Sequence, residues 1–103
     1  PDANFGFYGS YSDLTSRTLL SLGQNECSYQ VGLIDAEIFK QGILAQQTNL
    51  LSSLSNWKVY YRQTENHTLL PAQDYTTAEV NGVKFVTWVN DLHNGTAVDI
   101  IDN

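Results

Sequence analysis

"YTTAEVNGVKFVTWVNDLHNGTAVDII", residues 75–101, holds two Asn-Gly pairs between runs that are rich in β-branched and aromatic side chains. Asn-Gly is the strongest short-range signal for a two-residue β-turn, because both turn positions need positive φ. The two pairs therefore predict antiparallel strands over residues 75–80, 83–91 and 96–101. With an alternating strand over residues 57–63, they predict a four-stranded antiparallel meander.

A two-residue turn also fixes which residues face each other across a hairpin. The first turn is expected to place Val80 opposite Val83 and Glu79 opposite Lys84. Carried across both turns, the same register puts three large side chains in a row on one sheet face: Tyr75, Trp88 and Ile101. The opposite face is mainly apolar, and we expect the longest helix to pack on it.

Two helices and one further strand are predicted in the first half of the chain. Ser12 is a suitable N-cap for a short helix that ends near Gly23, and Asp35 is a suitable N-cap for the longest helix. This second helix spans about residues 36–55, with an apolar stripe formed by Phe39, Ile43, Leu50 and Leu54. Gly42 inside it costs roughly 1 kcal/mol relative to Ala, which predicts a close packing contact there. Residues 27–34 are predicted to form a strand.

The fold class predicted from these elements is α+β, in a single domain over residues 1–103. Residues 1–11, "PDANFGFYGSY", form an extended aromatic arm, and residues 12–55 are mainly helical with one strand. Residues 57–101 form the meander, on which the long helix packs. Four aromatic side chains in the arm are too apolar to stay free in water, so we expect them to dock on a sheet edge or face.

The charge balance limits the possible partners. The net charge is −6, and the five Lys and Arg residues are scattered along the chain, whereas nucleic-acid binding needs clustered positive charge. No apolar run approaches the ~18 residues of a membrane helix. We therefore expect another protein or a second copy of the chain as partner, with no nucleic acid and no membrane insertion. The many uncharged polar residues favour an extracellular location or a cell or virion surface.

Sequence motifs for catalysis or metal binding are weak. Cys27 is the only cysteine, which excludes an internal disulfide and a cysteine zinc cluster and leaves a buried thiol, a reactive thiol or a link to another chain. A metal site would need His67 and His93 to meet Glu65 and Asp91. Histidines on the surface are the simpler interpretation, so no metal, cofactor or catalytic residue is assigned.

Two classes of function remain. The first is a non-enzymatic interaction or assembly module of an appendage, virion or other surface protein. Its predicted interaction surface consists of Phe5, Phe7, Tyr8, Tyr11, Tyr75, Trp88 and Ile101. The alternative is a small-molecule-binding or enzymatic domain, with a cavity between the long helix and a curved sheet. That cavity would be lined by Tyr29, Tyr61, Thr87 and Asp91.

Overall fold

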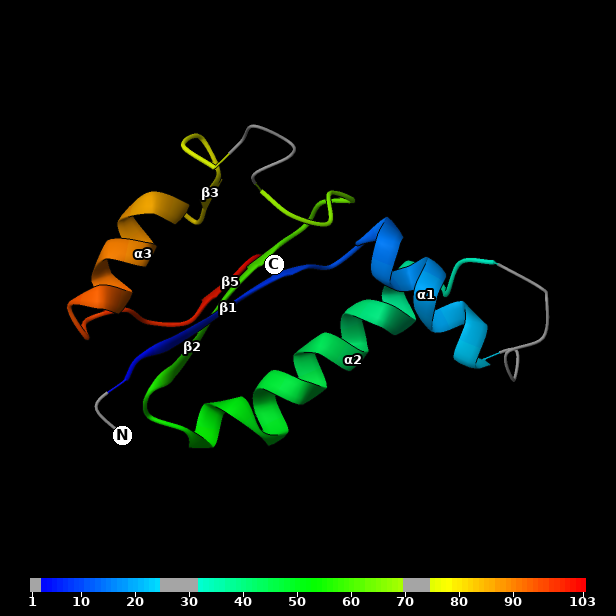
Figure 1. Ribbon diagram of the computed structural model, residues 1–103, viewed down its shortest axis with the longest axis horizontal. Coiled ribbons are helices and arrows are strands. Elements are labelled where there is room, and N and C mark those ends of the chain that lie inside the picture. The colour runs from blue at the N-terminus through cyan, green and yellow to red at the C-terminus, as the bar shows by residue number, and fades with distance from the viewer. Residues whose placement is uncertain (1–2, 25–31, 70–74) are drawn as a thin grey trace.

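The computed structural model describes residues 3–24, 32–69 and 75–103 of the chain (Figure 1). In chain order the elements are β1 (Phe5–Ser10), α1 (Leu14–Gln24), α2 (Ala36–Asn49), the 3-10 turn η1 (Leu51–Ser53), β2 (Trp57–Arg62), β3 (Glu79–Val80), β4 (Val83–Lys84), α3 (Phe85–His93) and β5 (Ile100–Ile101).

The main sheet is parallel, so the predicted antiparallel meander is wrong. Its strand order is β1-β2-β5, and both neighbouring pairs run parallel. Parallel strands need a long crossover connection, usually with a helix. Here α1 and α2 lie between β1 and β2, while the β3–β4 hairpin and α3 lie between β2 and β5. The described residues therefore form a mixed α/β arrangement of three α-helices, a parallel three-stranded sheet and a separate two-stranded hairpin.

The first Asn-Gly pair forms the predicted turn. Asn81 and Gly82 have φ angles of 52° and 81°, as a type I′ turn requires. The hairpin register is also confirmed, with Glu79 opposite Lys84 and Val80 opposite Val83. The hairpin ends after two residue pairs, because the chain turns into α3 at Phe85.

The second Asn-Gly pair ends a helix, so the predicted second hairpin is wrong. Gly95 has a φ of 75°. Its amide donates to the Leu92 carbonyl at 3.2 Å, and the Thr96 amide donates to the Asp91 carbonyl at 2.8 Å. These two bonds form a Schellman motif, in which glycine is the favoured residue just after the helix. The residues before it form α3 because their apolar side chains are spaced for one helix face: Phe85, Trp88, Val89 and Leu92.

The sheet lies between two helical layers, with α3 on one face and α2 on the other (Figure 1). Each face carries its own apolar cluster. The α3 face buries Tyr60, Val80, Trp88, Ala97 and Ile100. The α2 face buries Tyr11, Leu51, Val59 and Tyr61. Three consecutive residues of β2 are therefore buried, which is typical of a parallel strand covered on both faces.

The aromatic segment at the N-terminus forms β1 and pairs with β2 inside the same chain, from Phe5 opposite Trp57 to Ser10 opposite Arg62. Glycine lets this strand approach its neighbours closely. A Cβ on Gly6 would lie 2.5 Å from Leu92 Cδ2 in α3. A Cβ on Gly9 would lie 2.8 Å from the Tyr61 ring. Both faces of β1 therefore fit against other elements only because these side chains are missing.

The helix boundaries match the sequence in part. Asp35 caps α2 as predicted, accepting hydrogen bonds from the amides of Glu37 and Ile38, but the helix ends at Asn49 and continues as η1. Asp13, rather than Ser12, accepts the Ser16 amide at the start of α1. Of the strand predicted over residues 27–34, residues 27–31 lie outside the described residues, and 32–34 have no regular structure. Among the described helices, none has the length and apolar character needed to cross a membrane.

Candidate functional site

A groove of about 790 Å³ lies between the two helices that precede β2 and the C-terminal half of β1. Three groups of residues line it. β1 contributes Phe7, Tyr8, Gly9 and Ser10, and α1 with its N-cap contributes Asp13, Ser16, Leu19 and Leu20. The start of α2 and the loop after β2 contribute Ile34, Ile38, Phe39, Gly42, Ile43, Gln46, His67 and Thr68.

Hydrogen bonds hold the two helical walls of the groove together. Arg17 of α1 donates from Nε to the Ile34 carbonyl at 2.8 Å, and the Ile34 amide donates to the Arg17 carbonyl at 3.4 Å. Ser21 Oγ accepts the Gly32 amide at 3.2 Å. The segment that leads into α2 is thus attached along α1, which keeps the two helices at a set separation.

The helical walls are apolar and open to solvent. Leu19 and Leu20 of α1 are 62% and 53% exposed, and Ile38 of α2 is 64% exposed. Gly42 also faces this space, and a Cβ added there would meet nothing within 4 Å. The close packing contact expected at Gly42 is therefore absent from the described structure, and the glycine widens the groove instead. Apolar side chains left open on one concave surface are typical of binding sites.

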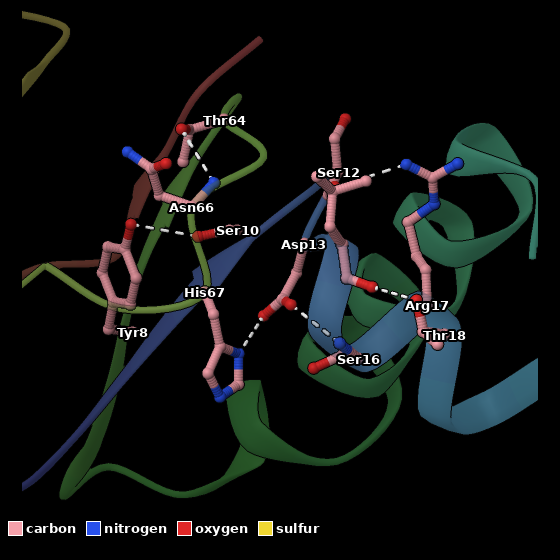
Figure 2. A network of polar contacts seen from close by, with 11 residues as sticks. Tyr8, Ser10, Ser12, Asp13, Ser16, Arg17, Thr18, Thr64, Asn66 and His67 are labelled. Atoms are coloured by element: carbon pink, nitrogen blue, oxygen red, sulfur yellow. Dashed lines mark hydrogen bonds and ion pairs between the residues drawn. The ribbon is translucent and has the colours of Figure 1, made fainter. Parts of the chain in front are cut away.

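A polar pair lies where β1 meets α1. Figure 2 shows the His67 ring turned toward the start of α1, with Nδ1 facing Asp13 Oδ2 at 2.7 Å. The second carboxylate oxygen of Asp13 accepts the Ser16 amide at 2.8 Å. Asp13 is only 6% exposed, whereas the His67 side chain is 52% exposed. A buried carboxylate therefore caps α1 and orients a partly exposed imidazole.

The Asp13 carboxylate fixes the hydrogen-bonding character of His67. An ionised carboxylate only accepts hydrogen bonds, so Nδ1 of the imidazole is the donor. In the neutral ring Nε2 is then an acceptor, and it points away from Asp13 (Figure 2). When the ring is neutral, the groove lining therefore offers an imidazole nitrogen that accepts a hydrogen bond from a bound molecule.

Two serines lie near this pair without completing a catalytic triad. Ser10 Oγ donates to the Tyr8 hydroxyl at 3.0 Å, and Ser16 reaches Asp13 through its main-chain amide. Within the described residues, neither serine hydroxyl hydrogen-bonds His67. This arrangement positions a hydrogen-bond acceptor and assigns no nucleophile.

Two buried tyrosines lie beside the groove, on the α2 face of the sheet. Tyr61 meets Phe7 of the groove edge-on, with ring centroids 6.2 Å apart, and meets Tyr11 at 5.8 Å. Burial raises the pKa of both tyrosines to about 12, and the charges of Asp102 near Tyr11 and Asp99 near Tyr61 add to the shift. Neither hydroxyl has a hydrogen-bond partner within the described part of the chain. The neutral phenols are therefore strongly favoured here.

The residues of the predicted interaction surface lie in several places. Phe7 and Tyr8 line the groove. Phe5 is 44% exposed and stacks on Trp57 at 4.9 Å. Tyr11 is fully buried on the α2 face. The remaining three do not share a sheet face: Trp88 is buried on the α3 side, Tyr75 packs against Phe85, and Ile101 packs on the α2 side.

Of the remaining predicted site residues that the structure describes, His67 lines the groove and the others do not. Thr87 and Asp91 lie on α3, across the sheet, and Tyr61 is fully buried. Tyr29 and Cys27 lie outside the described residues. His67 pairs with Asp13, while His93 ends α3. Among the described residues, no three His, Cys, Asp or Glu side chains are grouped to hold a metal ion.

Little in the sequence indicates the pair that defines this site. Asp13 and His67 are 54 residues apart, and only the tertiary fold brings them together. Gly42 was visible as an unfavourable residue within a helix, which was a usable signal for the groove. Comparisons with protein-family models, curated proteins and solved structures found no match for this chain.

Proposed function

We propose that this chain is a binding protein that holds a small, largely apolar molecule in the groove between β1, α1 and α2. One observation carries the proposal: an open apolar groove of about 790 Å³ has the buried Asp13 and its partner His67 in its lining. Pockets for small ligands are typically 300–1,000 Å³, mostly apolar, with a few placed polar groups. The groove has this size and this composition.

The polar pair indicates the head group of the ligand. Nε2 of neutral His67 accepts a hydrogen bond, so it favours a hydroxyl or an ammonium group. Within two residues of the lining in sequence, the acidic Asp35, Glu37 and Glu65 outnumber the basic Arg17 and Lys40, and the chain carries a net charge of −6. These charges favour a cationic or neutral head and disfavour a carboxylate.

Calorimetric titration with three ligands that share one alkyl chain tests this proposal. Dodecylamine and dodecanol, below their aggregation concentrations, are expected to bind more tightly than dodecanoate. Because head-group discrimination comes from one hydrogen bond and nearby charge, the difference should be about tenfold, or ~1.4 kcal/mol. Absence of binding by all three ligands, or tightest binding by dodecanoate, contradicts the proposal.

Gly42 and Gly23 provide a matched pair of control variants. Both are exposed helical glycines at which a Cβ meets nothing within 4 Å, but only Gly42 lines the groove. Gly42→Leu adds a side chain into the groove and should weaken dodecylamine binding. Gly23→Leu should leave binding unchanged, so equal effects of the two substitutions would place the ligand elsewhere.

A second candidate function is a non-enzymatic interaction or assembly module. The observation that favours it is a set of large exposed apolar side chains outside the groove: Phe5 (44%), Leu50 (55%), Leu54 (38%) and Val98 (63%). If the chain self-associates, the amide chemical shifts at these positions should change as the protein concentration rises. Nuclear magnetic resonance measures this change. Shifts at none of them would contradict self-assembly. An extracellular location or a cell or virion surface suits both candidate functions, and the many uncharged polar residues support it.

A further inference from the structure

The outer edge of β1 has main-chain hydrogen-bonding groups that no other described strand pairs with. The Phe5 amide bonds the Asn56 carbonyl and the Tyr11 amide bonds the Arg62 carbonyl, each at 2.8 Å. Odd-numbered residues of β1 therefore point their N–H and C=O groups toward β2, and those of Gly6 and Tyr8 point the opposite way. Within the described residues, no strand pairs with β1 on that side.

At Phe5, Gly6 and Phe7, which are exposed, this edge lacks the features that usually protect an edge strand, whereas Gly9 and Ser10 are buried. Natural proteins block such edges with lysine, proline, bulges or very short strands. β1 has six residues, "FGFYGS", with no charge and no proline, and Phe5 and Phe7 are 44% and 40% exposed. At the other edge of the sheet, β5 is only two residues long.

We propose that two copies of this chain pair through the outer edges of their β1 strands, antiparallel and with Phe7 on the two-fold axis. This inference rests on the second candidate function, and it names the partner and the contact. Gly6 of each copy lies opposite Tyr8 of the other, and the two pairs exchange four main-chain hydrogen bonds. Phe7 faces Phe7 at the non-hydrogen-bonded position between them, where antiparallel Cα atoms are about 4.5 Å apart.

The side chains fit this register. In β1, Gly6 and Tyr8 share the α3 face, so each Tyr8 lies beside Gly6 of the other copy, over which Leu92 and Trp88 are packed. Leu92 already covers Gly6, which gives the incoming tyrosine an apolar neighbour. Such self-complementarity is the requirement of a two-fold contact, in which the same patch serves both subunits.

The charge distribution also favours this contact. Each copy carries a net charge of −6, so most approaches of one copy to another are repulsive. The segment from Ala3 to Ser12 contains no Asp, Glu, Lys, Arg or His. Pairing along β1 therefore brings together two segments that contain no charged side chain.

Cysteine cross-linking tests the register directly, in a background where Cys27→Ser removes the natural thiol. Phe7→Cys places two thiols on the axis at a separation that suits a disulfide. Mild oxidation should convert it to a covalent dimer of twice the 11.5 kDa chain mass. Phe5→Cys is the matched control on the same strand and face, and it should remain monomeric because its opposite residue is Gly9.

Sedimentation of the unmodified chain completes the test. We expect the unmodified chain to form a dimer at higher concentration. Phe7→Lys should abolish this dimer, because the substitution brings two lysines together on the axis. Phe5→Lys should weaken the dimer less. A monomer at all concentrations, or preferential cross-linking at Phe5→Cys, overturns the proposal. If Leu50 and Val98 shift with concentration but Phe7→Cys does not cross-link, assembly stands and this contact fails. Ligand titrations on dilute monomer are independent of either result.

Discussion

The two faces of the sheet differ where they meet β1. On the α3 face, the rings of Tyr8, Tyr60, Phe85 and Trp88 form a continuous cluster, with neighbouring centroids 5.2–6.5 Å apart. On the α2 face, Val59 and Tyr61 of the central strand are buried, but the helices leave a groove beside β1. We infer that one face supplies most of the stability and that the other keeps space for a ligand.

Two glycines show the same contrast at the level of single atoms. The position of a Cβ on Gly6 is occupied by Leu92 and Trp88 of α3. The position of a Cβ on Gly42 is empty, although it lies in a helix where alanine would be more favourable. The missing side chain of Gly6 lets α3 pack closely on one face, whereas the missing side chain of Gly42 leaves the groove open on the other face.

The largest expected effect is on the closed face. Trp88→Ala should lower the free energy of unfolding by about 3–5 kcal/mol, because it leaves a cavity in the aromatic cluster and removes the hydrogen bond from Nε1 to the Val98 carbonyl. Phe39→Ala, in the groove, should cost only about 1 kcal/mol. Urea unfolding measures both, and similar losses would show that the faces do not differ.

Alkaline pH should destabilise the chain through the tyrosines of the α2 face. The pKa values of Tyr11 and Tyr61 are about 12 in the folded chain, against 10.0 for a free phenol. Above pH 10 the unfolded chain loses these protons first, so stability falls as pH rises from 10 to 12. The loss should reach roughly 2–3 kcal/mol by pH 11. Tyr11→Phe with Tyr61→Phe should flatten the profile; an unchanged slope would contradict the burial of both phenols.

Alanine at the two glycines should change stability in opposite directions. Gly6→Ala should destabilise by roughly 1–3 kcal/mol, because its Cβ meets Leu92 at 2.5 Å and Trp88 at 2.8 Å. Gly42→Ala should stabilise by up to about 1 kcal/mol through helix propensity. Thermal unfolding followed by circular dichroism measures both changes, and a change of the same sign at the two sites would remove the contrast.

Substitutions of Asp13 distinguish its role as the N-cap of α1 from its role in orienting His67. Asp13→Ala should cost about 1 kcal/mol, because α1 loses its N-cap. Asp13→Asn keeps a good cap and should stay within a few tenths of a kcal/mol of the parent. Both variants lose the carboxylate that orients His67, so both should reduce the preference for dodecylamine over dodecanoate. Retained preference in Asp13→Asn would argue against this pair as the head-group site.

The sequence predicted local features that depend on a few neighbouring residues. The start of α2 at Asp35, the strand from Trp57 and the register of the first turn all follow from side chains within a short window. The prediction of a second hairpin turn was wrong because a glycine with positive φ is equally suited to a hairpin turn and to the end of a helix. The helical spacing of Phe85, Trp88 and Leu92 was present in the sequence, and it is a better guide than the turn signal.

Features that depend on distant residues were not accessible. Pairing of β1 with β2 joins segments about 50 residues apart, and it belongs to a parallel sheet where an antiparallel meander was expected. Asp13 and His67 meet only because the loop after β2 passes the start of α1. The groove itself depends on how β1, α1, α2 and the loop after β2 are placed together, which no local pattern encodes. Phe7 and Tyr8 were singled out as interaction residues, and they line this groove.

Amide chemical shifts during a dodecylamine titration test most directly whether the two faces have different roles. We expect saturable shifts at residues of the groove, namely Leu20, Ile38, Gly42 and His67, with Val89 and Ala97 of the α3 side unchanged. The same titration on Gly42→Leu should require a higher ligand concentration. Shifts concentrated on α3, or spread evenly over the chain without saturation, would contradict a ligand site on the open face.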